Sequence, residues 1–125
     1  MKAPTFPFSQ RQLNCLILVA AGVKRGMGAK ILNISYGAFN CAYDQAQVKL
    51  TSLFFRVQEY SYTELLQKLS KQYCLSVSEI EIGLKQLLEN ALEVPQIKAI
   101  LADSSVDTFL KLLYQYYRVL LEKYQ

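Results

Sequence analysis

The sequence predicts an all-α protein, a compact bundle of about five helices with one long central helix, and three observations support this fold. Apolar residues recur at intervals of three and four along much of the chain, and no segment alternates as a strand does. Pairs of Ser with Gln or Glu three positions later mark several helix starts. The 125 residues are 52% apolar and 19% charged, a globular composition. We therefore expect a single domain over residues 1–125.

The first predicted helix begins after Ser9, which forms a capping box with Gln12. It is expected to run to about Arg25, with Gly26 as the left-handed residue that ends it. Its apolar run, residues 13–23, is well short of the ~20 residues of a membrane span. The run therefore indicates a buried helix, and we expect the chain to be a mature cytoplasmic protein with no contact to a membrane.

A long central helix is predicted after Gly28, because apolar residues step alternately by four and three there. The residues in this pattern are Leu32, Tyr36, Phe39, Tyr43, Ala46, Leu50, Leu53 and Val57. The pattern crosses Gly37, where we expect another backbone to approach closely. A central bundle helix is favoured over a self-associating coiled coil, because Tyr and Ala stand where a zipper prefers Leu and Ile.

The second half of the chain is predicted to hold four shorter helices. The first is expected over 62–73, after a capping box of Ser61 and Glu64, and the second follows a capping box of Ser78 and Glu81 and ends before Pro95. A short third helix is expected over 96–102. After a breaker at 103–105, the last helix should run from 106 to the C-terminus. The first two of these resemble a helix-turn-helix with residues 74–77 as the turn. The second helix carries four Glu against Lys85 alone, so DNA phosphates would repel it, and a packed helical hairpin is favoured.

The residue types present exclude several kinds of chemistry. The chain has no His, so Ser-His-Asp and Cys-His nucleophiles and His-based metal sites cannot form. Its three cysteines, Cys15, Cys41 and Cys74, lie far apart without a C-x-x-C pair, and we expect all three in the core rather than as reactive thiols. Neither a metal, a cofactor nor an enzymatic activity is expected.

Charge is distributed unevenly along the chain. Residues 1–58 hold seven Lys and Arg against one acid, Asp44, whereas residues 59–125 hold seven against nine acids. This asymmetry predicts a basic face suited to phosphate-rich partners and an acidic face suited to protein neighbours. A solvated surface with uneven charge is the alternative explanation.

The segment from Lys24 to Lys30 is the most informative local feature. Lys24, Arg25 and Lys30 surround a Gly-x-Gly turn that precedes the long helix, so backbone N–H groups, a helix dipole and cations could meet one anion there. It is not a Walker loop, because the required spacing is absent. An ordinary helix C-cap is the alternative.

The tyrosine-rich segment 114–118 suggests stacking on nucleic-acid bases. Tyr117 belongs to the apolar stripe of the last helix, so only Tyr116 and Tyr114 are expected off the core. Packing at a protein interface explains these two equally well.

In size, helicity and charge, the chain resembles the small all-helical subunits of CRISPR RNA-guided effector complexes. This resemblance implies a non-enzymatic subunit that contacts the nucleic-acid backbone, with neighbouring protein subunits on the acidic half. The expected contact residues are Lys24, Arg25 and Lys30, and secondarily Arg11, Lys49 and Arg56. Two alternatives remain: a protein-binding adaptor or chaperone-like module, and a helix-turn-helix regulator.

Overall fold

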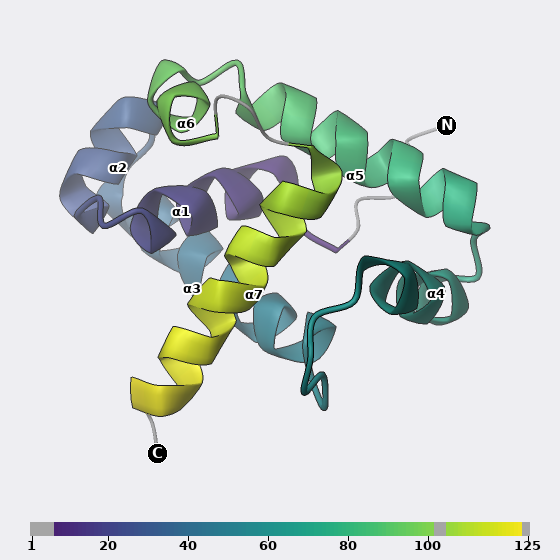
Figure 1. Ribbon diagram of the computed structural model, residues 1–125. Coiled ribbons are helices and arrows are strands. Elements are labelled where there is room, and N and C mark those ends of the chain that lie inside the picture. The colour runs from purple at the N-terminus through teal and green to yellow at the C-terminus, as the bar shows by residue number, and fades with distance from the viewer. Residues whose placement is uncertain (1–6, 102–104, 124–125) are drawn as a thin grey trace.

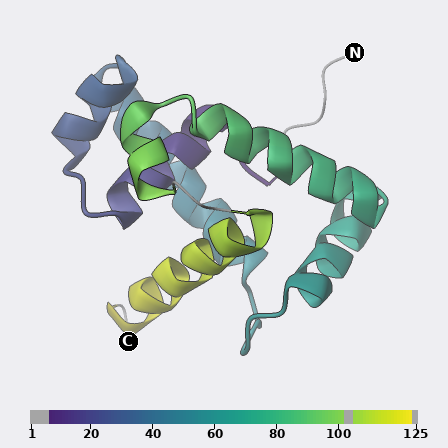
Figure 2. The same ribbon diagram turned by 45° about the horizontal axis from the view of Figure 1, so that its top comes forward.

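The computed structural model describes residues 7–101 and 105–123, and within these ranges it contains seven helices and no strand (Figure 1). The helices are α1 Gln10–Ala20, α2 Arg25–Leu32, α3 Tyr36–Leu53, α4 Tyr62–Tyr73, α5 Val77–Ala91, α6 Pro95–Ile100 and α7 Val106–Lys123. The all-α prediction is confirmed, with more and shorter helices than expected. In both ribbon views α2 lies at one side and the α4–α5 pair at the other, with α7 crossing between them (Figures 1 and 2).

The central helix is α1, because five of its apolar side chains are fully buried and it contacts α2, α3, α5, α6 and α7. The buried residues are Leu13, Cys15, Leu16, Ile17 and Leu18. A helix that is apolar on most sides must be enclosed by others. Its predicted capping box is confirmed: the Gln12 amide donates to Ser9 Oγ at 3.2 Å, and the Ser9 amide donates to Gln12 Oε1 at 3.0 Å. In the part of the chain described, no helix is both long and apolar enough to cross a membrane.

The predicted end of the first helix was wrong. α1 ends at Ala20, and the left-handed residue that closes it is Gly22, with φ +91°. The Val23 amide donates to the Leu18 carbonyl at 3.0 Å, the bond of a Schellman motif. Gly26 instead lies inside α2.

The prediction of one long central helix after Gly28 was also wrong, because the segment forms two helices. Asn33 adopts a left-handed conformation (φ 57°, ψ 46°) that stops α2. Ser35 then caps α3, its Oγ accepting a 3.0 Å hydrogen bond from the Ala38 amide. The apolar periodicity holds from Phe39 to Leu53, whose stripe residues are buried, whereas Tyr36 is 57% exposed.

The close approach expected at Gly37 occurs at Gly28 instead. A Cβ placed on Gly28 would lie 2.6 Å from Cε2 of Phe39, so the absence of a side chain lets α2 and α3 meet there. A Cβ on Gly37 would have no neighbour within 4 Å.

The second half follows the prediction more closely. α4 spans the predicted residues, and Ser61 caps it. α5 begins earlier than expected, because the capping box is formed by Ser76 and Glu79 rather than by Ser78 and Glu81. α5 ends before Pro95 and α6 follows, as predicted. For α7, Ser105 Oγ accepts a bond of 3.2 Å from the Thr108 amide, while positions 102–104 and the last two residues lie outside the described ranges.

The turn between α2 and α3 and the turn between α4 and α5 have the same backbone conformation. Cys74, like Asn33, is left-handed (φ 56°, ψ 41°), and each is followed by a half-buried apolar residue and an extended Ser that caps the next helix. The Leu75 amide donates to the Ser70 carbonyl at 3.1 Å, and the Ile34 amide donates to the Ala29 carbonyl at 3.0 Å. The chain therefore contains two helix-turn-helix units, one in each half.

Candidate nucleic-acid interface

The first turn of α2 is a basic helix end. Lys24 is the residue that precedes the helix, Arg25 is its first residue, and no side chain caps it. The first backbone N–H groups of a helix have no intrahelical partner and form the positive end of its dipole. Cations and free donors therefore gather at Lys24 and Arg25. The alternative of a helix C-cap at Gly26 was wrong, because this segment begins a helix rather than ending one.

Arg25 connects this helix end to the middle of α3. Its Nη1 donates a 2.9 Å hydrogen bond to Asn40 Oδ1 and lies 3.7 Å from Asp44 Oδ1. The guanidinium group also stacks over the Tyr43 ring, 4.6 Å from its centroid. Half-buried Arg25 thus shares its charge with the one acid of the basic half, and it fixes α2 against α3.

Lys24, Lys30 and Arg11 are exposed, and no hydrogen bond or ion pair with another described residue holds their side chains. Lys30 lies in the last turn of α2, five positions after Arg25. Residues five apart point in directions roughly 140° apart on a helix. The structure therefore brings Lys24 and Arg25 together and leaves Lys30 on another side of α2, while Arg11 lies in the first turn of α1.

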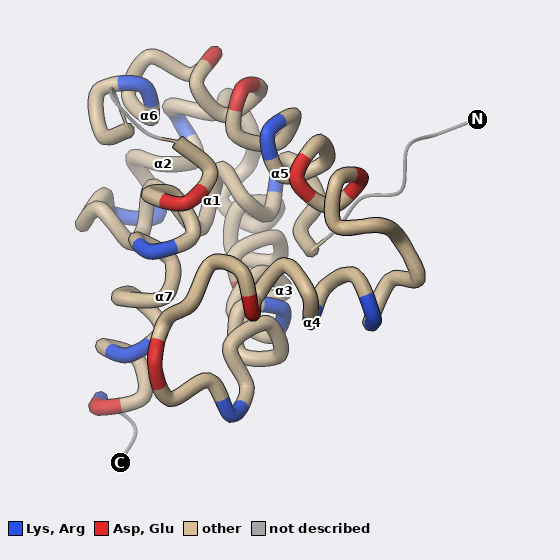
Figure 3. Tube along the Cα trace, turned by 45° about the vertical axis from the view of Figure 1, so that its right-hand side comes forward, with Lys and Arg blue, Asp and Glu red and all other residues tan. Residues whose placement is uncertain are grey.

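Lys49 and Arg56 have contacts with other side chains of the protein. Lys49, half-buried in α3, donates a 2.7 Å hydrogen bond to Gln12 Oε1, and Gln12 Nε2 donates to Gln45 at 2.9 Å. These bonds tie the start of α1 to α3. Arg56 lies in the connection between α3 and α4 with φ 63° and its guanidinium over the Phe55 ring. Figure 3 shows Lys and Arg distributed over several sides of the molecule, with Asp and Glu between them.

The face of α3 turned away from the core is open along its length. Gly37, Cys41, Asp44, Gln45 and Val48 are exposed there and Asn40 is half-buried. Val48, at 71%, is an unusually exposed apolar side chain. This face was not predicted, because the apolar pattern placed the residues of α3 inside one longer helix. The Asn33 and Ser35 pair was the signal that could have revealed it.

The exposed surface of α5 is more acidic than the open face of α3, on which Asp44 is the one exposed charged residue. Its exposed residues include Glu79, Glu81, Ile82, Lys85 and Glu89. The two helix-turn-helix units therefore share a turn but present different surfaces.

The tyrosines of α7 do not form a stacking surface. Tyr117 is buried as predicted, but Tyr114 is buried too, so that part of the prediction was wrong. Tyr114 donates a 3.0 Å hydrogen bond to the Gln58 carbonyl and packs edge-on against Phe54. Tyr116 is half-buried, and its hydroxyl lies 2.5 Å from that of Tyr43.

The prediction of three core cysteines holds only for Cys15, where burial raises the pKa of the thiol to about 11. Cys41 and Cys74 are exposed. Cys41 faces away from the core on α3, and Cys74 occupies the turn after α4. The prediction that Cys41 and Cys74 lie in the core was therefore wrong.

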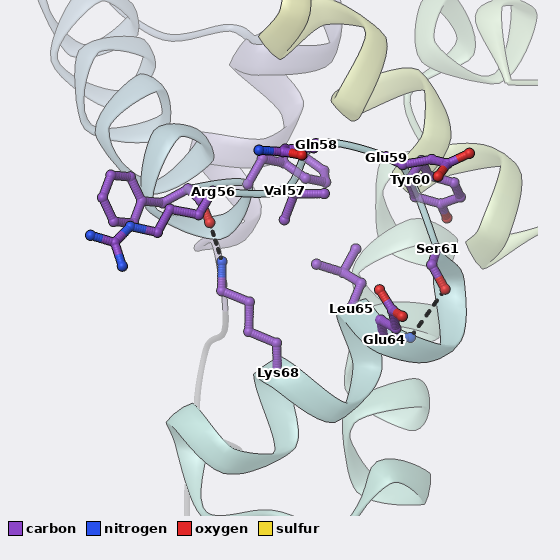
Figure 4. A pocket seen from close by; sticks show the side chains of 11 residues that line it. Arg56, Val57, Gln58, Glu59, Tyr60, Ser61, Glu64, Leu65 and Lys68 are labelled. Carbon is purple, nitrogen blue, oxygen red and sulfur yellow. Dashed lines mark hydrogen bonds between the residues drawn. The ribbon is translucent and has the colours of Figure 1, made fainter.

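A cavity of about 440 Å³ lies between α4 and the connection from α3 (Figure 4). Val57 and Leu65 face one another across it. Lys68 and Ser61 are two of the polar residues that line the cavity. The Lys68 ammonium group donates hydrogen bonds to the backbone carbonyls of Ser52, Leu53 and Phe55. The Ser61 hydroxyl accepts a hydrogen bond from the Glu64 backbone amide. These two polar groups are therefore engaged within the protein.

Comparison with known proteins adds no relative: no family model matches the chain, and no curated protein or solved structure is significantly similar to it. The resemblance to CRISPR effector subunits stays a prediction.

Proposed function

We propose that this protein binds duplex DNA without catalysis, placing α3 in the major groove and the first turn of α2 against a phosphate. One observation carries the proposal: a three-residue turn joins α2, whose first turn is basic, to a helix whose outer face is open and largely polar. In DNA-binding helix-turn-helix units, the second helix enters the major groove while the first crosses the backbone.

Charge supports the same assignment. Residues 9–53 contain five Lys and Arg and one acid, a net charge of +4. Non-specific attraction to DNA depends on such cations, each of which displaces counterions from the phosphates. Lys24, Lys30 and Arg11 are the exposed candidates for these contacts, and the N–H groups of the first α2 turn are donors for a phosphate. Lys49 and Arg56, which have partners in the protein, are secondary.

The DNA-binding helix-turn-helix is thus assigned to α2 and α3, residues 25–53, rather than to residues 62–94. The acidic face of α5 still argues against DNA at the second unit, because carboxylates near phosphates are repelled. An enzyme is not proposed, since no catalytic group is assigned to this site.

A protein-binding adaptor remains a second candidate, favoured by the groove between α5 and the start of α7. This groove has a volume of about 580 Å³ and its walls include Leu88, Leu92 and Val106. Nearby on α5, Ile82 is 68% exposed. The DNA-binding unit and a protein-binding second half are compatible, as in a subunit of a larger assembly.

The proposal is tested by fluorescence anisotropy with a labelled random-sequence duplex at about 50 and 200 mM salt. The variant K24E/K30E is compared with K98E/K111E, which reverses two exposed lysines of α6 and α7 and changes the net charge equally. We expect the first variant to bind at least about tenfold more weakly, with a shallower salt dependence by roughly two counterions, and the second to change much less. Circular dichroism checks that both variants stay helical.

Two outcomes contradict the proposal. Wild-type protein that does not bind any duplex at the lower salt concentration excludes DNA as the ligand. Equal weakening by both charge reversals means that net charge alone, rather than the positions of Lys24 and Lys30 on α2, attracts the duplex.

A further inference from the structure

Asp44 lies on the open face of α3, and its side chain is 65% exposed. It is the only acidic residue among the first 58 positions of the sequence. Asn40 precedes it by one helical turn and Val48 follows by one turn, so all three belong to the face that we propose to enter the major groove.

A carboxylate on a DNA-binding face weakens attraction to phosphates, so its presence there requires an explanation. The ion pair with Arg25 is a weak one, because the two groups are 3.7 Å apart and an exposed pair contributes little. Arg25 also has the shorter bond of 2.9 Å to Asn40 and the stacking contact with Tyr43. Asp44 is therefore not needed to hold Arg25 in place.

The chemistry of base edges supplies the explanation. An ionised carboxylate only accepts hydrogen bonds, so it must meet a donor. In the major groove, guanine presents two acceptors, and thymine presents an acceptor and a methyl group. Cytosine presents the N4 amino donor alone, whereas adenine combines a donor with the N7 acceptor, which suits Asn or Gln better than a carboxylate.

We infer that Asp44 selects cytosine at one position of the bound DNA, an inference that rests on the proposed function. The ligand is then a duplex with a C·G pair at the position that Asp44, in the middle of α3, contacts. Arg25 is a positioning residue in this arrangement, because its guanidinium joins the first turn of α2 to Asn40 and Asp44. The phosphate contact and the base contact are thereby fixed relative to one another.

The inference gives Asp44 two measurable effects. Opposite cytosine it accepts a hydrogen bond, and opposite guanine or thymine it faces an acceptor and is repelled. Replacing it with alanine removes both effects. Asp44→Ala should therefore lose base preference at one position while binding random-sequence duplex more tightly than wild type.

The test selects binding sites from a pool of randomised duplexes with the full chain, its D44A and D44N variants, and E89Q. Glu89 is an exposed residue of α5, so E89Q removes the same charge outside the proposed interface. Wild type and E89Q should enrich a common site with one C·G pair. D44A should lose about tenfold discrimination at that pair alone, and D44N should shift its preference toward adenine.

The outcomes separate this inference from the proposed function. If wild type selects a defined site and D44A selects the same site with the same preference at every position, the role of Asp44 is excluded and DNA binding stands. If wild type binds duplexes without enriching any C·G pair, the inference is likewise excluded. If wild type does not bind any duplex, both fail. Circular dichroism and a urea unfolding curve for D44A show that a changed preference is not a folding defect.

Discussion

The Lys68 ammonium group donates a hydrogen bond of 2.7 Å to the backbone carbonyl of Leu53, the last residue of α3. It also lies 3.3 Å from the carbonyls of Ser52 and Phe55. The last carbonyls of a helix have no intrahelical partner and carry the negative end of its dipole. Lys68 therefore caps α3 from the neighbouring helix α4. Burial lowers the pKa of Lys68, and these bonds compensate for part of that cost.

Replacing Lys68 with methionine is expected to lower the free energy of unfolding by about 1–2 kcal/mol, because the α3 carbonyls lose their charged donor while the aliphatic packing is retained. Urea unfolding followed by circular dichroism measures the change. Lys71→Met on exposed Lys71, also in α4, is the control and should change the free energy by less than about 0.5 kcal/mol. Equal effects from both variants would show that the three carbonyls do not depend on Lys68.

Gly28 and Gly26 offer a matched comparison within α2. Gly28→Ala places a methyl group 2.6 Å from the Phe39 ring and should destabilise the protein by about 1–3 kcal/mol, because the ring or the helix must move. Gly26→Ala meets nothing within 4 Å and should stabilise it by about 0.5–1 kcal/mol, since alanine favours the helix. Thermal unfolding of the two variants should therefore shift in opposite directions. A stabilising Gly28→Ala would contradict the close α2–α3 contact.

The cysteines should differ in reactivity. Thiol–disulfide exchange with a chromogenic disulfide needs an accessible thiolate. At pH 8, exposed Cys41 and Cys74 should react within minutes, whereas Cys15, with a pKa of about 11 and a buried side chain, should react only after denaturation. Counting the thiols released before and after adding denaturant checks this prediction, and C15A should abolish the second phase. A C15A protein that keeps a denaturation-dependent phase would place the buried thiol elsewhere.

Stability should fall at alkaline pH. Burial, and then the hydrogen bond to the Asp107 carboxylate at 2.7 Å, raise the pKa of Tyr60 far above its usual value. Because the folded pKa exceeds the unfolded value of about 10, the contribution of the neutral phenol is complete below about pH 10 and is lost as pH rises further. Urea unfolding at pH 9 and at pH 11 measures the loss.

Tyr60→Phe should reduce the difference in stability between these two pH values, although Tyr62 and Tyr73, whose pKa values are also raised by burial, maintain part of it. Tyr36→Phe, at a residue that is 57% exposed, is the control and should leave the difference unchanged. A pH dependence identical in Tyr60→Phe and wild type would contradict the role of Tyr60.

Local signals in the sequence were sufficient for most helix starts. The Ser9 and Ser61 caps were assigned correctly, because a capping residue acts on backbone groups only two or three positions away. At α5 the same pattern occurs twice within three residues, and the sequence did not indicate that Ser76 rather than Ser78 would be the cap.

The candidate interface depended on contacts that no local pattern contains. The cations of the Lys24 to Lys30 segment were identified from the sequence, but their surroundings were not. Arg25 meets Asn40 and Asp44 only because Gly28 lets α2 lie against Phe39. Apolar periodicity continues across Asn33, so the break that exposes the start of α3 was overlooked.

Composition and three- to four-residue spacing are local properties, so they were sufficient to predict an all-helical chain, the Ser9 and Ser61 caps, and the concentration of acids after residue 58. Contacts between helices determined that α1 is the central helix, that two turns of the same shape occur along the chain, and that Asp44 faces outward beside Arg25. Packing chooses among helical arrangements through contacts between residues distant in sequence, and these depend on shape rather than on periodicity.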